Sequence, residues 1–149
     1  MSSYRIVVGV DGSDGGRRAL RWALREAATR GGTVQAVYAW RWDEVPPNIA
    51  TTRDQEQRRA EETLLREVES VREQVGAIQS EVKVDRLVME GRAADVLTAA
   101  ARDADLLVLG SHGHSRVRVT VLGSVSEECV RKGTCPIVVL PVPKPAHES

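Results

Sequence analysis

Apolar residues in this chain gather in short runs that are separated by longer segments with a different spacing. The runs cover residues 4–10, 33–40, 82–89, 106–109 and 136–140. The first of them, YRIVVGV, is apolar at almost every position, which is typical of a strand that is covered on both faces of its sheet. The runs therefore predict five strands.

The segments between these runs carry apolar residues three or four positions apart, as on one face of a helix. This spacing predicts helices over residues 16–30, 51–78, 92–103 and 123–132. The longest helix has a stripe of six apolar residues: Ala60, Leu64, Val68, Val71, Val75 and Ile78. A stripe this short favours packing on a sheet, and a coiled-coil contact with a partner is the alternative.

Short polar and glycine residues mark where the predicted helices begin and end. Ser13 or Asp14 is suited to cap the first helix, and Gly31 with Gly32 to end it. Residues 41–79 hold a proline-containing loop and the long helix, and residues 141–149 form an extended, proline-rich tail. We expect one domain over residues 1–149.

The alternation of strands and helices predicts an α/β fold. Such a chain forms a single parallel sheet with right-handed crossovers and helices on both faces, as in Rossmann-like proteins. Ligands of these sheets bind beyond the carboxyl ends of the strands. Two glycine-rich loops have that position here, one over residues 11–15 and one over residues 110–123.

Composition narrows the classes of function. Apolar residues make up 42% of the 149 residues, and 21 Lys and Arg balance 21 Asp and Glu, so we expect no dedicated nucleic-acid binding. No apolar stretch is long enough for a signal peptide core or a membrane span. Cys129 and Cys135 fit neither a disulfide framework nor a zinc pattern, which favours free thiols in the cytoplasm. His112 and His114 lack a third nearby ligand, so no metal site is predicted.

The second glycine-rich loop has features that suit phosphate. Gly110 and Gly113 would let the backbone approach an anion, because they carry no side chain. A helix that starts near Gly123 would present free N–H groups and a partial positive charge. Its first residues, Ser124, Val125 and Ser126, would add amides and hydroxyls, and Arg116 and Arg118 lie between the glycines.

Each of these features has a simpler explanation that the residues alone leave open. Ser124 and Glu127 have the spacing of a capping box, which needs no ligand. Asp11, directly after the first strand, would accept a hydrogen bond from a ligand or from its own turn. The chain contains neither the P-loop motif nor the G-x-G-x-x-G dinucleotide motif.

The order of these segments resembles the universal stress protein family. Gly110-x2-Gly113-x9-Gly123-Ser124 is similar to that family's ATP-binding signature. The opening segment YRIVVGVDGSDGGRRALRWA and the last strand CPIVVL are similar to the family's first and last strands and first helix. The resemblance covers nearly the whole chain except residues 41–79.

The resemblance implies a sheet of order 3-2-1-4-5, a homodimer and ATP, with Mg²⁺, as ligand. It places Val10, Asp11, Ser13 and Ala39 near the adenine and ribose, and Gly110, Gly113, Gly123, Ser124, Val125 and Ser126 around the ribose and phosphates. It implies a regulatory role in a stress response, with a protein partner that the sequence does not identify. The homodimer is expected to form through residues 136–140, an apolar strand suited to a sheet edge.

Other functions remain open at this stage. No residue stands out as a general base, so efficient ATP hydrolysis is not predicted, although slow hydrolysis stays open. One alternative is a dimerisation module without nucleotide. Another is a phosphoacceptor receiver domain, which the Lys144-Pro145 pair resembles, but Glu90 stands where that fold has its acceptor aspartate.

Overall fold

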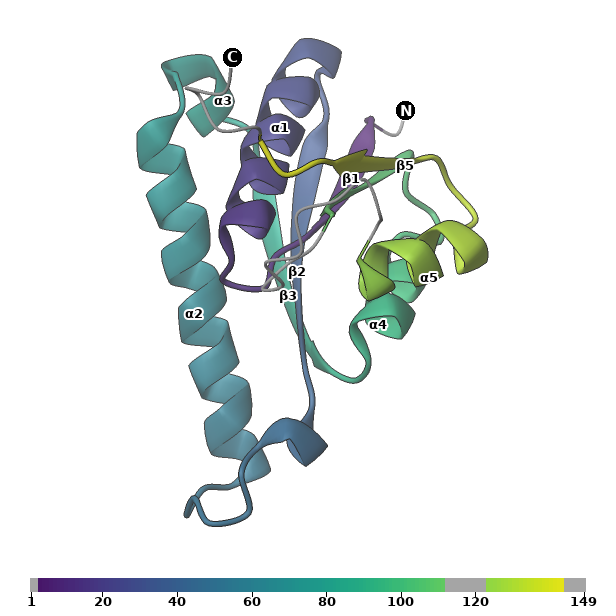
Figure 1. Ribbon diagram of the computed structural model, residues 1–149. Helices are drawn as coiled ribbons and strands as arrows, with labels where there is room; N and C mark the ends of the chain where they lie inside the picture. Colours follow the sequence, from purple (N-terminus) through teal and green to yellow (C-terminus); the bar gives the residue numbers. More distant parts are fainter. Residues whose placement is uncertain (1–2, 112–122, 144–149) are drawn as a thin grey trace, which may run out of the picture.

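Five parallel strands form one sheet in the order β3-β2-β1-β4-β5, which confirms the predicted fold and strand order (Figure 1). The computed structural model describes residues 3–111 and 123–143. The strands are β1 (Arg5–Gly9), β2 (Thr33–Trp40), β3 (Val84–Glu90), β4 (Leu106–Gly110) and β5 (Ile137–Leu140).

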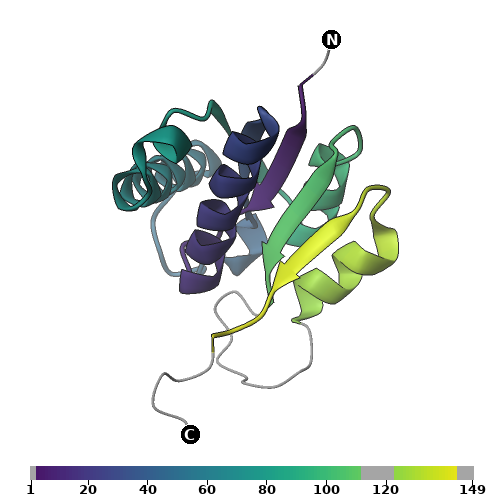
Figure 2. The same cartoon turned by 90° about the horizontal axis from the view of Figure 1, so that it is seen from above.

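Helices cover both faces of this sheet, as Figure 2 shows from above. α1 (Asp14–Arg30) and α2 (Arg53–Gln74) lie on one face, followed by the short α3 (Ala77–Ser80). α4 (Ala93–Ala100) and α5 (Ser124–Lys132) lie on the other face. A single 3-10 turn, η1 (Trp42–Glu44), follows β2. No described helix is both long and apolar enough to cross a lipid bilayer.

Strand β1 lies at the centre and contributes to two hydrophobic cores. Ile6 and Val8 face α1 and α2, whereas Val7 faces α4 and α5, and all three side chains are fully buried. Successive side chains of a strand point to opposite faces, so a central strand between two helical layers must be apolar at every position. This explains the continuous apolar run at residues 4–10.

The two ends of α1 follow the predicted signals. Ser13 is the N-cap, and its hydroxyl oxygen accepts a hydrogen bond from the Gly16 N–H at 3.2 Å. Gly31 closes the helix in the left-handed conformation at φ +65°, and its N–H donates to the Ala27 carbonyl oxygen. The helix begins at Asp14, two residues earlier than predicted, because Asp14 and Gly15 are also helical.

Most of the apolar stripe of α2 packs on the sheet. This confirms the prediction of sheet packing, which was favoured over a coiled-coil contact. Leu64 and Val68 are buried against the sheet. The prediction was wrong at Ile78, whose side chain is 72% exposed. The helix ends at Gln74, because Val75 adopts extended backbone angles (φ −103°, ψ 167°) and Gly76 then starts the separate helix α3.

Candidate functional site

The two predicted glycine-rich loops meet at the carboxyl ends of β1 and β4. Gly110 ends β4, and Gly15 lies in the first turn of α1. A Cβ atom on Gly110 would lie 2.9 Å from the carbonyl oxygen of Gly15, closer than real Cβ atoms come to other atoms. Gly110 therefore has a packing reason to be glycine that does not depend on any ligand.

The turn after β1 is held by Asp11 and Ser13. One carboxylate oxygen of Asp11 accepts hydrogen bonds from the Ser13 N–H at 3.0 Å and from the Ser13 hydroxyl. Gly12 between them has φ +82°, a conformation that glycine adopts easily. Asp11 thus bonds within its own turn, as the simpler explanation expected, and its role toward a ligand stays a prediction.

The start of α5 is joined to the sheet through the backbone of Ser111. The Ser111 N–H donates to the Leu140 carbonyl oxygen at 3.0 Å, and the Ser111 carbonyl oxygen accepts from the Gly123 N–H at 2.6 Å. The bond from the Glu127 N–H to the Gly123 carbonyl oxygen opens the helix. The amides of the three residues before Glu127 have no carbonyl oxygen within the helix to bond.

The capping-box explanation of Ser124 was wrong. The N-cap of α5 is Gly123, no side chain caps the helix, and Ser124 is its first helical residue. Ser126 is buried instead, and its hydroxyl donates to the Gly110 carbonyl oxygen at 2.9 Å. The fold itself therefore gives Ser126 a bonding partner.

Ser111 is a candidate site residue that the sequence reasoning did not name. Its side chain is only 6% exposed, and its hydroxyl has no hydrogen-bond partner within the described part of the chain. Leaving a buried hydroxyl unsatisfied costs about 1–3 kcal/mol, so such groups are rare. Its position directly after a buried strand, between two glycines of the signature, was the available signal.

Three of the predicted site residues are not seen together with the two loops: Val10 and Ala39 have side chains packed in the two cores, and Gly113 lies outside the described residues. The Val10 side chain is buried on the face of α1 and α2, and its N–H donates to the Val37 carbonyl oxygen at 2.9 Å. Ala39 lies near the end of β2, paired with Met89, and packs toward α4. Gly113 lies outside the described residues, as do His112, His114, Arg116, Arg118 and Lys144-Pro145.

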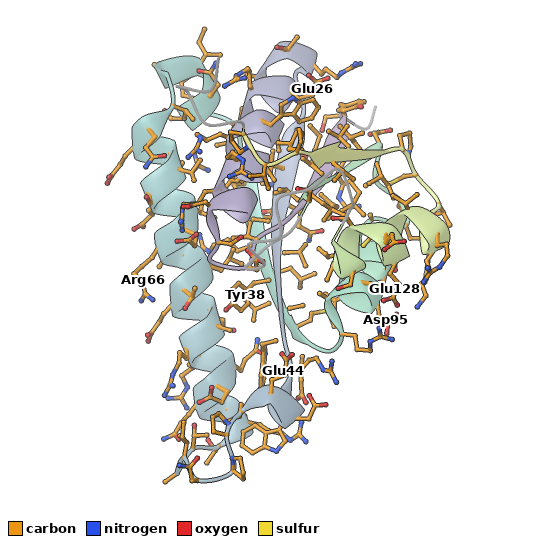
Figure 3. All side chains as sticks on the ribbon, in the orientation of Figure 1. Glu26, Tyr38, Glu44, Arg66, Asp95 and Glu128 are labelled. Carbon is orange, nitrogen blue, oxygen red and sulfur yellow. The ribbon has the colours of Figure 1, made fainter. Side chains whose placement is uncertain are left out.

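Tyr38 is a second residue that sequence reasoning missed. It lies between the sheet and α2 (Figure 3) and is partly buried. Burial raises the pKa of its hydroxyl above 10.0, and the nearby negative charges of Asp11 and Glu67 raise it further. The phenol is therefore a neutral hydrogen-bonding group near the Asp11 turn at physiological pH.

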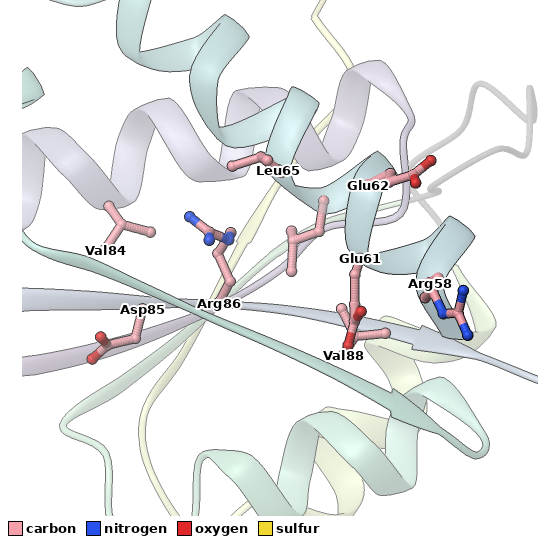
Figure 4. A pocket seen from close by; sticks show the side chains of 9 residues that line it. Arg58, Glu61, Glu62, Leu65, Val84, Asp85, Arg86 and Val88 are labelled. Atoms are coloured by element: carbon pink, nitrogen blue, oxygen red, sulfur yellow. The ribbon is translucent and has the colours of Figure 1, made fainter. Parts of the chain in front are cut away.

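A hollow of about 500 Å³ lies elsewhere, between α2 and the edge strand β3 (Figure 4). Its lining mixes cations and anions, among them Arg58, Arg86, Glu61 and Asp85. None of the predicted site residues contributes to it. Within residues 3–111 and 123–143, no three His, Cys, Asp or Glu side chains converge as a metal site would require.

Two universal stress proteins illustrate the similarity of this chain to known proteins. A universal stress protein of Mycobacterium tuberculosis is 32% identical over 136 residues, which cover 91% of this chain and 47% of that protein. One of Thermus aquaticus is 31% identical over 137 residues, covering 91% and 96% of the two chains. This chain therefore spans about half the length of the mycobacterial relative.

Solved structures agree with these matches. The universal stress protein of Archaeoglobus fulgidus in complex with dAMP superposes with a TM-score of 0.64 at 28% identity, covering 93% of this chain and 98% of that one. A universal stress protein in complex with cAMP has a TM-score of 0.66 at 24% identity over 94% and 98%, and shows the shared fold. Residues 3–141 also match the family model described as the universal stress protein family. The chain belongs to the universal stress protein family.

Proposed function

We propose that this chain binds ATP at the carboxyl ends of β1 and β4. The observation that carries the proposal is the buried Ser111 hydroxyl, which has no partner among the described residues and lies beside the start of α5. A helix N-terminus attracts anions, and an unsatisfied buried hydroxyl next to it is a further donor for a phosphate oxygen. A bound phosphate would satisfy both.

The polarity of the two loops sets the orientation of the nucleotide. The amides of Ser124, Val125 and Ser126 are donors and suit phosphate oxygens. The Asp11 carboxylate only accepts hydrogen bonds, so it suits the ribose hydroxyls or the adenine amino group. In this proposal Val10, Ser13 and Ala39 border the adenosine, and Gly110, Gly113 and Gly123 let the backbone approach the phosphates.

The Archaeoglobus fulgidus universal stress protein in complex with dAMP supports an adenine nucleotide as the ligand class. This chain keeps the serine and all three glycines of the signature. Mg²⁺ would enter with the phosphates, which together with water usually supply most of its ligands. We propose a regulatory role in a stress response, exerted in the cytoplasm, where the two free cysteines stay reduced.

The nucleotide site can be tested at Ser124. Because Ser124 is the first residue of α5 and Gly123 before it is extended (φ −68°, ψ 164°), proline fits there without breaking the helix. Ser124→Pro removes one amide donor, whereas the matched Ser124→Ala removes only the hydroxyl. Calorimetry with Mg-ATP should show binding to the wild-type chain and a weaker affinity for Ser124→Pro than for Ser124→Ala. No heat with the wild-type chain would refute the proposal.

We further propose a homodimer through the open edge of β5. The other edge strand, β3, carries the exposed charges of Asp85 and Arg86, which disfavour pairing, whereas β5 reads Ile-Val-Val-Leu. Leu107 donates to the Pro136 carbonyl oxygen and Ser111 to that of Leu140.

That bonding pattern directs the Val139 amide to the open edge. Val139→Pro should therefore leave the β4 ladder intact and convert the dimer to a monomer in light scattering. A wild-type chain that is monomeric at all concentrations would refute the dimer.

A further inference from the structure

Arg17 joins three parts of the molecule around the turn that follows β1. One terminal nitrogen, Nη1, donates to the Gly12 carbonyl oxygen at 3.1 Å and to Glu67 Oε1 at 2.9 Å. The other, Nη2, donates to the Asp14 carboxylate. The guanidinium therefore connects the turn, the first residue of α1 and the middle of α2. The side chains of Arg17 and Glu67 are 27% and 15% exposed.

Arg17 and Asp11 bond different parts of the same turn: Arg17 bonds the Gly12 carbonyl oxygen, and Asp11 bonds Ser13. Asp11 and Ser13 bond to each other inside the turn, while the Gly12 carbonyl oxygen points to Arg17. Gly12 is in the left-handed region, and a Cβ added to it would meet no atom within 4 Å, so that side of the turn is open. The Arg17 guanidinium is rigid and planar, and it bonds the Gly12 carbonyl oxygen together with Asp14 and Glu67.

Glu67, the acceptor on α2, carries a second negative charge in the neighbourhood of Tyr38. Burial raises the pKa of the Tyr38 hydroxyl, and the nearby charges of Asp11 and Glu67 raise it further. Arg17 thus bonds both to the turn that contains Asp11 and to Glu67. The turn that carries Asp11 is thus linked through Arg17 to α2, and the whole of α2 lies within residues 41–79, which the resemblance to the family does not cover.

We propose that Arg17 is a positioning residue for the adenosine end of the nucleotide site. It acts through Gly12 and Asp11 and contacts no ligand atom itself. The inference rests on the proposed nucleotide site. Glu67 on α2 also bonds Arg17. A substitution of Glu67 should therefore change nucleotide affinity only if Arg17 then loses its hydrogen bond to the Gly12 carbonyl oxygen.

Arg21 provides a matched control, because it also joins α1 to α2 but does not touch the turn. Its Nη1 donates to Gln74 Oε1 at 2.8 Å. Binding of adenosine, ATP and inorganic tripolyphosphate is measured by calorimetry for the wild-type chain, Arg17→Ala and Arg21→Ala. Arg17→Lys keeps the cation but cannot bond all three acceptors, and it serves if Arg17→Ala does not fold. Melting temperatures establish that each variant is folded.

We expect Arg17→Ala to weaken adenosine and ATP by the same factor, about tenfold, which corresponds to one lost hydrogen-bonded contact. Tripolyphosphate affinity should not change, and Arg21→Ala should bind all three like the wild-type chain. If Arg17→Ala and Arg21→Ala bind adenosine with equal affinity, the role of Arg17 is refuted but the proposed nucleotide site is not. A loss of tripolyphosphate affinity in Arg17→Ala would overturn it too, since Arg17 would then act on the phosphates. A wild-type chain that binds neither adenosine nor ATP would refute the proposed function itself.

Discussion

Gly110 and Gly15 touch backbone to backbone, and the contact is asymmetric. A Cβ on Gly110 would lie 2.9 Å from the carbonyl oxygen and 3.0 Å from the Cα of Gly15. A Cβ on Gly15 would lie 3.8 Å from the Cα of Gly110, an ordinary van der Waals distance. The contact holds the first turn of α1 against the end of β4, so it positions both loops of the proposed site.

This asymmetry predicts different effects for the same substitution at the two glycines. Gly110→Ala should lower the free energy of unfolding by about 1–3 kcal/mol, because backbone atoms must move to admit the methyl group. Gly15→Ala should be neutral or slightly stabilising, because alanine favours the helix. Urea denaturation of the two variants measures the difference. Equal stabilities would show that the two backbones are not in contact in solution.

The strands, the helices and the two-sided cover of the sheet were open to prediction because their signals are local, whereas the strand order followed from the resemblance to the family. A central strand such as residues 4–10 must be apolar throughout, and a cap such as Ser13 needs only its own turn. The start of α5 was harder. Ser124 and Glu127 have capping-box spacing, but the backbone of Ser111, which is distant in sequence, bonds Gly123 and makes it the N-cap instead.

The rest of the site could not be predicted because it depends on contacts between distant segments. Ser111 looks like an ordinary loop serine until β5 and α5 enclose it. The bond from Arg17 to Gly12 spans five residues, but its partner on α2 is fifty residues away. No periodicity or motif in a single sequence reports such a pairing.

Two buried serines, Ser111 after β4 and Ser126 in α5, should respond differently to substitution by alanine. Ser126→Ala removes the bond to the Gly110 carbonyl oxygen and should cost about 1 kcal/mol of folding free energy. Ser111→Ala removes a hydroxyl that lacks a partner among the described residues, so stability should be unchanged or higher. Thermal unfolding without nucleotide measures both effects.

The same Ser111 variant tests the nucleotide proposal. If its hydroxyl donates to a phosphate, Ser111→Ala should weaken ATP about tenfold, corresponding to one lost hydrogen bond to a charged group, while Ser111→Thr retains affinity. Calorimetry with Mg-ATP measures both variants against the wild-type chain. A Ser111→Ala protein that is less stable and binds ATP normally would show that the hydroxyl serves the fold instead.

Two residues of the predicted apolar stripe, Leu64 in α2 and Ile78 in α3, differ in burial and should differ in their contribution to stability. Leu64 is fully buried against the sheet, whereas Ile78 on α3 is 72% exposed although it continues the same stripe in sequence. Leu64→Ala should cost about 2–5 kcal/mol, and Ile78→Ala should change stability by less than about 0.5 kcal/mol. Urea denaturation compares them. A large loss for Ile78→Ala would place this residue in a core or an interface.

The Cys129 thiol should make stability fall in alkaline solution. The residue is fully buried on α5. Burial first, and then the negative charge of Glu128, raise the pKa of Cys129 from 9.0 to about 11. Above pH 9 the thiol ionises in the unfolded chain but not in the folded one, so the unfolded state is favoured. This contribution to stability is complete below pH 9 and is lost as the pH rises toward 11.

Comparison with Cys129→Ala isolates this effect from other groups that titrate in the same range. The stability of the wild-type chain minus that of the variant should be constant below pH 9 and then fall by up to about 1.4 kcal/mol per pH unit. Cys135→Ala serves as the matched control, because Cys135 is the other free cysteine and is less buried. Burial, and then the charge of Asp105, also raise the pKa of Cys135. Iodoacetamide at pH 8.5 should label Cys135 before Cys129, as followed by mass spectrometry. Rapid labelling of Cys129 in the folded chain would mean that α5 opens readily, and the alkaline loss would then have another cause.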